Sequence, residues 1–255
     1  MLKLDYNTYR SIKGFNRRVR FLVMHYTALN FQNSVNALSG NGTVSAHYLV
    51  PDPTDITFHS AGFDEMIVFN LVDEHERAFH AGVSTWAGRS NLNDSSIGIE
   101  IVNEAKDNNG HFIFPPYDAI QIDAVKKLAL NIIARYPDIS PTNIVGHSDI
   151  APGRKSDPGA AFPWKSLYEA GIGAWYDDDT KEKYKQKYRT VLPSKADILE
   201  KLKQYGYDIS MSNTESGYQM LLRAFQLHFR QENYDGIADL ETIAILYALT
   251  EKYFS

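Results

Sequence analysis

A glycine- and proline-rich loop, residues 146–159, carries the side chains with the clearest chemical potential in this sequence. It places His147, Lys155 and Asp157 close together, directly after a short apolar run. A neutral imidazole and a carboxylate are both zinc ligands, and a catalytic zinc typically has three protein ligands and one open position. The loop offers two ligands. We predict His25 as the third, because it ends another apolar run, where a strand presents its last side chain at the edge of a sheet.

Glu100 is the residue that we predict as a general base. It follows the apolar run 97–99, which is typical of a buried strand, and an unpaired carboxylate is costly to bury. Burial raises the pKa of a carboxylate toward the working range of a base, whereas a nearby cation lowers it again. A structural salt bridge is the alternative role for Glu100. Glu104, in a more polar context, is the second choice for the base.

The segment 74–80 resembles the His-Glu-x-x-His helix of zinc peptidases, but its spacing excludes that role. His75 and His80 are five residues apart, which on a helix separates their directions by about 140°. His47 alternates with its neighbours in a short strand, which favours a structural role near the site. No function is assigned to three histidines in polar or loop-like segments, His59, His75 and His111.

Five short motifs follow one another along the chain, at residues 23–28, 45–50, 79–82, 93–100 and 147–159. In this order they resemble the zinc-dependent N-acetylmuramoyl-L-alanine amidases of the type 2 fold, relatives of the phage amidases and the peptidoglycan recognition proteins. The resemblance covers residues 15–175, and five ordered motifs are far more specific than any one of them. The branch that it resembles carries a peptidoglycan-binding module behind the amidase domain.

The resemblance implies a role for each of these side chains. It places one zinc ion per chain on His25, His147 and Asp157, with Glu100 as the general base and Lys155 as a donor to the oxyanion. Two neutral imidazoles and one carboxylate leave a zinc centre positively charged, which lowers the pKa of water toward about 7. The implied reaction is hydrolysis of the amide bond between N-acetylmuramic acid and the L-alanine of the stem peptide. A solvated loop lysine is the alternative for Lys155.

Three further residues are predicted to contact the substrate. The resemblance implies that His80 lines the cleft without binding metal. Trp86 is suited to stacking on a sugar ring or a stem peptide, although a core tryptophan fits its context equally well. Amidases of this branch often carry a basic residue before the Leu-Asn-Asp turn, where this chain has Asn91. Arg89, two residues earlier, is the candidate replacement, which leaves the choice between anhydro and intact muramyl substrates open.

The elements that must position these residues follow from hydrophobic periodicity. Strands are predicted at residues 19–25, 46–50, 66–72, 97–102 and 143–147. A helix with one apolar stripe is predicted over 118–136, between prolines at either end, and a shorter helix over 163–170. This order of elements predicts an α/β fold with a mixed central sheet flanked by helices.

The composition changes near residue 175, which predicts two domains. The resemblance implies that residues 1–175 are the zinc amidase catalytic domain, and the charged stretch 176–193 is predicted as a linker or an exposed helix. Residues 194–255 contain three helical patterns, which predict a small three-helix domain. Its Phe-Gln, Asp-Gly and Thr positions resemble the signature of three-helix peptidoglycan-binding modules. A helical cap packed on the catalytic domain is the alternative.

Composition and charge bound the partners. The chain has 255 residues, of which 44% are hydrophobic, no cysteine and a net charge of −5. The charge argues against nucleic acid as a partner, because phosphate binding needs a basic surface. No run approaches the roughly 18 apolar residues of a membrane helix. We expect a monomer whose partner is peptidoglycan or a muropeptide.

The first residues contain no apolar signal core, yet a wall-binding module is useful only where intact wall exists. We therefore favour the periplasm or the cell surface, with a signal or lipoprotein segment outside this sequence, over the cytoplasm. Two rival functions remain. A non-catalytic peptidoglycan-binding protein is disfavoured by the full ligand set. A metallopeptidase that cuts within the stem peptide performs the same amide chemistry, so the zinc ligands alone do not exclude it.

Overall fold

The computed structural model describes residues 2–40, 42–108 and 111–255 and has a five-stranded central sheet in the order β3-β2-β6-β1-β9. Strands β2, β6, β1 and β9 are parallel, and β3 is an antiparallel edge strand. Their bounds are β1 Phe21–Tyr26, β2 Tyr48–Val50, β3 Phe69–Asn70, β6 Ser96–Ile101 and β9 Ile144–Gly146. Each overlaps a predicted strand, and the mixed sheet flanked by helices confirms the predicted fold class.

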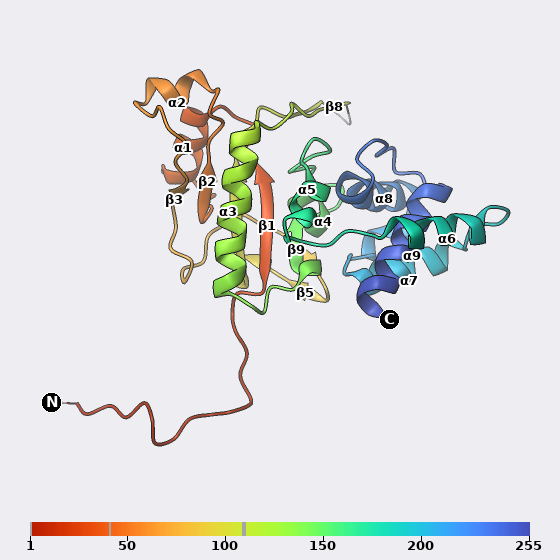
Figure 1. Cartoon of the computed structure of the whole chain (residues 1–255), viewed down its shortest axis with the longest axis horizontal. Coiled ribbons are helices and arrows are strands. Elements are labelled where there is room, and N and C mark those ends of the chain that lie inside the picture. The colour runs from red at the N-terminus through yellow and green to blue at the C-terminus, as the bar shows by residue number, and fades with distance from the viewer. Residues whose placement is uncertain (1, 41, 109–110) are drawn as a thin grey trace.

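The central strand β1 shows why this sheet is parallel and covered on both faces. Leu22, Val23 and Met24 are consecutive and fully buried, so neighbouring residues that point to opposite faces both meet protein. A continuous apolar run of this kind is typical of a parallel strand between two layers. In Figure 1, α3 (Ala119–Arg135) runs alongside β1. It begins where the side chain of Asp118 accepts a hydrogen bond from the amide of Ile120, as the predicted helix requires.

Shorter elements surround the sheet. The helices are α1 Phe31–Ser39, α2 Ile56–Ser60, α4 His147–Ile150 and α5 Trp164–Glu169, with single 3-10 turns η1 Leu92–Asp94, η2 Pro141–Asn143 and η3 Ser210–Asn213. Two small antiparallel pairs consist of β4 Thr85–Trp86 with β5 Arg89–Ser90 and of β7 Lys106–Asn108 with β8 His111–Ile113. Of these, α4 matters most for the site, because it begins at His147.

The last part of the chain is helical. The three predicted helices are α7 Lys195–Tyr205, α8 Glu215–Phe229 and α9 Leu240–Phe254. The stretch predicted as a linker or an exposed helix contains α6, Asp178–Tyr188. Rings of Tyr184 and Tyr188 pack against Tyr247 of α9, at 5.3 and 5.0 Å between centroids. The stretch is therefore largely a helix that packs against α9 rather than an extended linker.

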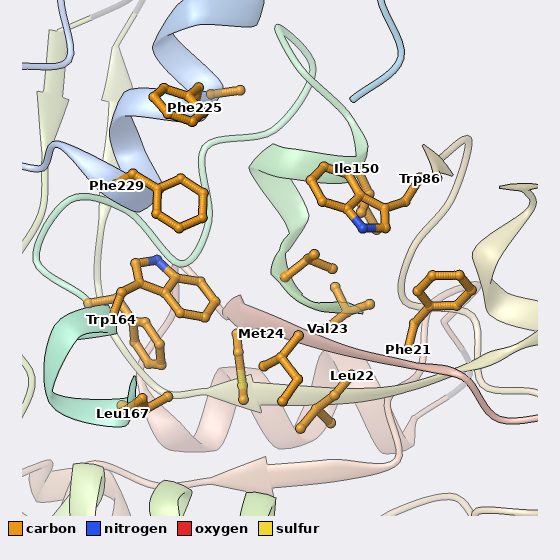
Figure 2. Close-up of a cluster of buried hydrophobic side chains, with 14 of the residues drawn as sticks. Phe21, Leu22, Val23, Met24, Trp86, Ile150, Trp164, Leu167, Phe225 and Phe229 are labelled. Carbon is orange, nitrogen blue, oxygen red and sulfur yellow. The ribbon is translucent and has the colours of Figure 1, made fainter. Parts of the chain in front are cut away.

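Residues 194–255, here called the helical unit, share a hydrophobic core with the rest of the molecule. One continuous cluster of buried side chains runs from the sheet through Trp164 into Phe225 and Phe229 of α8 (Figure 2). On another side, the ring of Trp86 lies 4.7 Å from that of Tyr207. Each buried aromatic side chain stabilises the fold by about 1.5–3 kcal/mol. The helical unit therefore packs against the rest of the molecule through a shared apolar core.

Candidate metal and active site

Three neighbouring parallel strands bring the predicted residues to one edge of the sheet. His25 on β1 pairs in register with Glu100 on β6, and β9 lies on the other side of β1. His147 follows β9 directly as the first residue of α4. Because parallel strands present their carboxyl ends at the same edge, residues far apart in sequence meet there, which is the usual place for a ligand in such sheets.

The loop after α4 completes the group by returning Asp157 to the same edge. The amide of Ser148 donates to the carbonyl oxygen of Asp157 at 2.9 Å, which fixes the return. Three side-chain atoms then converge: His25 Nδ1 lies 3.0 Å from His147 Nδ1 and 2.9 Å from Asp157 Oδ2, and His147 Nδ1 lies 3.0 Å from that oxygen. All three residues are at most 5% exposed.

The atoms that converge in this group are suited to binding a cation. His147 Nε2 lies 3.0 Å from the carbonyl oxygen of Ala81. A carbonyl only accepts, so Nε2 carries the proton, and the Nδ1 of a neutral ring is then a lone pair. That lone pair faces the carboxylate of Asp157, and two buried acceptors without a hydrogen between them repel each other. The three residues can therefore hold a metal ion, as their joint placement indicates.

Burial sets the protonation of the group. Burial is the largest cause that lowers the pKa of His25 to about 4, and the charge of the neighbouring His147 is the next. Burial alone would raise the pKa of Asp157, but the positive charge that His147 and His25 carry when they are protonated lowers it well below its usual range. Burial, then the charge of Asp157, raises the pKa of Glu100 well above its usual range, and Lys155 partly offsets this. Glu100 therefore holds its proton more strongly than an ordinary carboxyl.

Glu100 lines the cleft beside the three residues that can hold a metal ion, here called the metal-binding group. Its Oε1 is 4.0 Å from His25 Nδ1, and within the described chain its buried Oε2 has no hydrogen-bond partner. Glu100, Lys155 and Asp157 line the same cleft, which has a volume of about 290 Å³. Glu104 is exposed and is not among the residues that line this cleft. Of the two glutamates predicted as candidates for the general base, only Glu100 therefore lines the cleft.

The three predicted substrate contacts lie in different environments. His80 lines the cleft, and its Nδ1 is 2.9 Å from His25 Nε2. Trp86 is only 1% exposed, and its indole N–H donates to the Thr142 carbonyl, so the ring is not available to a sugar and belongs to the core. Arg89 is exposed on β5 and is not among the cleft-lining residues. Of the three, only His80 reaches the site.

Other histidines lie as their sequence contexts suggest. His47 is buried, and its Nδ1 accepts the amide of Gly98 at 3.0 Å, a structural role beside the site. The remaining three predicted to have no function are exposed, His59, His75 and His111.

Sequence reasoning missed two side chains beside the metal-binding group. Tyr26 lines the cleft and its hydroxyl lies 2.6 Å from Ser156 Oγ, and Arg154 donates to the Ala81 and Val83 carbonyls. Their positions next to His25 and Lys155 were the available signal.

Comparison with known proteins decides the family. The N-acetylmuramoyl-L-alanine amidase family model matches residues 15–160, which include every member of the metal-binding group. The chain belongs to this family. The amidase AmiD of Escherichia coli K12 is 43% identical over 249 residues, covering 97% of this chain and 88% of that protein. The protein described here is therefore an enzyme that hydrolyses the amide bond between N-acetylmuramic acid and L-alanine.

Two solved structures resemble this amidase along its whole length. AmpDh3 from Pseudomonas aeruginosa, in complex with anhydromuramic pentapeptide, is 59% identical over 99% of both chains, with a TM-score of 0.96. AmiD from E. coli, in complex with anhydro-N-acetylmuramic acid-L-Ala-D-γ-Glu-L-Lys, is 42% identical over 97% of this chain and 94% of that chain, with a TM-score of 0.85. The similarity therefore includes the helical unit. In the described residues, no helix combines the length and apolar character needed to span a membrane.

Proposed function

We propose that this amidase holds one zinc ion per chain on His25, His147 and Asp157 and uses it to cleave muramyl peptides. The observation that carries the proposal is the buried group of acceptors, in which a neutral imidazole presents its lone pair to a carboxylate at 3.0 Å. Two imidazoles and one carboxylate form a typical set of catalytic zinc ligands. A bound zinc ion supplies Lewis-acid chemistry, which polarises a carbonyl group and lowers the pKa of water toward about 7.

The protein side chains perform the proton transfers. Glu100 takes a proton from the attacking water and passes it to the amine of L-alanine as that group leaves. Its raised pKa favours keeping the proton between these two steps, and a cation beside it brings the pKa back toward the working range. Lys155, which lines the same cleft, donates a hydrogen bond to the oxyanion as the carbonyl carbon becomes tetrahedral.

The substrate that we propose is a muramyl peptide, including its 1,6-anhydro form. Both full-length structural relatives were solved with anhydromuramyl peptides. The cleft of this chain also suits an uncharged sugar beside the charged reaction centre. Its wall beyond the reacting groups is made of hydroxyl and apolar side chains, among them Thr27, Ser34, Leu29 and Phe79. Arg89 is exposed and does not line the cleft, so we assign it no contact with this substrate.

Product analysis tests the proposal. The purified enzyme is incubated with sacculi, with an intact muramyl tripeptide and with its anhydro form, and new termini are identified by mass spectrometry. We expect N-acetylmuramyl residues with a free lactyl carboxylate and a peptide that begins with L-alanine. We also expect one zinc per chain by elemental analysis, and loss of activity on chelation. Glu100→Gln, which leaves the three ligands in place, is the control for contaminating hydrolases. Cleavage between amino acids of the stem would instead establish a metallopeptidase.

For the helical unit we propose a role in binding peptidoglycan. Its signature residues form one buried network, in which Gln226 accepts the amide of Gly236 at 2.7 Å and donates to Thr242 at 3.0 Å. They therefore shape the loop 231–236, which borders an open cleft of about 360 Å³ together with Phe112 and Arg223. Tyr234→Ala in this loop should weaken sedimentation with sacculi. Turnover of a small muramyl peptide should not change, and equal sedimentation would contradict the binding role.

Peptidoglycan lies in the cell envelope, so we propose that the enzyme acts in the periplasm or at the cell surface and works as a monomer. All proposed catalytic groups come from one chain, which supports a site that needs no second copy. Fractionation of the native cells locates the protein, and light scattering after size exclusion gives its mass. Recovery in the cytoplasm or a larger assembly would contradict these two points separately.

A further inference from the structure

Two consecutive residues contact both imidazoles of the metal-binding group from behind. The Nε2 of His25 lies 2.9 Å from His80 Nδ1, and the Nε2 of His147 lies 3.0 Å from the carbonyl oxygen of Ala81. Each imidazole thus presents Nδ1 to the group and Nε2 to the segment 80–81. A neutral imidazole has one proton, so the partner of Nε2 decides whether Nδ1 is a lone pair or a donor.

The direction of each hydrogen bond can be assigned stepwise from the Leu92 carbonyl, through Ser96 and His80, to His25. Ser96 Oγ lies 2.6 Å from the carbonyl of Leu92, which only accepts, so the serine proton is used there. Ser96 Oγ must then accept from His80 Nε2, 3.1 Å away. With its proton on Nε2, neutral His80 has a lone pair on Nδ1 and accepts from His25 Nε2. The relay from Leu92 therefore leaves a lone pair on His25 Nδ1.

The second imidazole reaches the same state by one step. The carbonyl of Ala81 accepts from His147 Nε2 and also from Arg154 Nη2, at 2.9 Å. Arg154 Nη2 lies 3.3 Å from His147 Nε2, because both donors converge on one oxygen. His147 Nδ1 is then a lone pair as well. Two independent routes through neighbouring residues give the same result for both imidazoles.

The segment 80–81 is itself held firmly. The side-chain oxygen of Asn93 accepts both backbone amides, of His80 at 3.1 Å and of Ala81 at 2.7 Å. The ring of His80 lies flat against β6 where residue 98 is glycine, and a Cβ there would lie 2.5 Å from the ring. His80 is 7% exposed. Neither its backbone nor its ring is therefore free to move away from His25.

We propose that His80 and Ser96 are positioning residues that, with the Ala81 carbonyl, set the tautomer of both metal-binding histidines before the metal arrives. This inference rests on the proposed zinc site and adds the reason why both Nδ1 atoms are ready to bind. Partners behind a ligand histidine typically change metal affinity by 10–100-fold when they are removed, about the range expected here.

The test compares zinc affinity in three variants of the full-length protein. Ser96→Ala frees His80 to reverse its tautomer, and His80→Phe removes both nitrogens but keeps a ring. Ser90→Ala, which removes an exposed serine on β5, is the control. Competition with a chromophoric chelator at constant pH gives each dissociation constant. We expect about 10-fold weaker binding for Ser96→Ala, up to about 100-fold for His80→Phe, and no change for Ser90→Ala.

Tautomers can be observed without zinc or substrate, by the ¹⁵N shifts of the imidazole rings in the zinc-free protein. We expect the His25 proton on Nε2 in the wild type and a shift toward Nδ1 in Ser96→Ala, with unchanged melting temperatures. Zinc binding by Ser96→Ala as tight as that of Ser90→Ala, or a wild-type His25 with its proton on Nδ1, would overturn the inference. Failure of the wild type to bind zinc would overturn the proposed function instead.

Discussion

Asp149 and Asp157 are both buried carboxylates near the same short helix, and their surroundings are opposite. Asp149 is fully buried and accepts three hydrogen bonds, from the amide of Gly146, the hydroxyl of Tyr207 and Nδ1 of His228. Asp157 is 5% exposed and faces the Nδ1 atoms of His25 and His147. The fold supplies donors to one carboxylate and lone pairs to the other.

This difference separates a structural carboxylate from a functional one. A buried charge is tolerated where hydrogen bonds or ion pairs satisfy it, and Asp149 is satisfied by the protein alone. Asp157 instead faces two imidazole nitrogens, and this is the reason why we propose it as a metal ligand. The donors to Asp149 also come partly from the helical unit, which therefore braces the helical turn that carries His147. Burial alone does not distinguish the two aspartates, whereas the hydrogen-bond donors around each of them do.

Asp157→Asn should have the largest effect on catalysis. The amide can donate to a histidine lone pair, so the zinc-free protein should remain folded, while the charge that attracts zinc is gone. We expect no bound zinc and no measurable hydrolysis, with a zinc-free melting temperature at or above that of the wild type. Elemental analysis, product formation and thermal unfolding measure these three quantities. Retention of zinc and activity by Asp157→Asn would contradict the functional role that we propose for Asp157.

Glu100→Gln changes the carboxylate beside the metal-binding group and should have the next largest effect on catalysis. The amide cannot take a proton, so kcat should fall by about 10²–10⁴-fold while zinc stays bound. Lys155→Met should lower kcat by about 10²–10³-fold, because an oxyanion donor is lost. Steady-state kinetics with a soluble muramyl peptide separate kcat from KM. Near-normal turnover in Glu100→Gln would move the role of base to another group.

Acid should weaken the zinc-free fold through the buried imidazole of His25. The pKa of His25 is lowered from 6.5 to about 4 by burial, so the unfolded chain binds its proton first as the pH falls. The free energy of unfolding should therefore decrease between about pH 6.5 and 4, by about 3 kcal/mol from this residue. Denaturant titrations across this range measure the slope.

Glu100 opposes this trend, because its raised pKa makes the folded state bind a proton before the unfolded state does. Glu100→Gln should consequently steepen the acid loss, and His25→Gln should flatten it. An unchanged slope in both variants would mean that other groups determine the acid sensitivity of the zinc-free protein.

The residues at strand ends were predictable from sequence, and those satisfied by distant partners were not. His25 and Glu100 end apolar runs, and parallel strands bring such ends together, so their meeting follows from local patterns. Trp86 gave no such signal. Its ring is covered by Tyr205 and Tyr207, more than a hundred residues away, and this contact turns a possible sugar platform into core. The Asp149 donors Tyr207 and His228 also lie far along the chain.

Asp149→Asn should have the smallest effect on catalysis, and it completes the comparison. An amide placed among donors can satisfy only part of them, so the folded state should lose about 1–3 kcal/mol. Tyr207→Phe, which removes one donor and leaves the carboxylate, should lose about 1 kcal/mol. Denaturant unfolding with saturating zinc measures both losses. Because neither change touches a ligand, zinc content and kcat per folded molecule should stay near wild type. A loss of zinc in Asp149→Asn as complete as in Asp157→Asn would show that the brace from the helical unit is required to form the metal site.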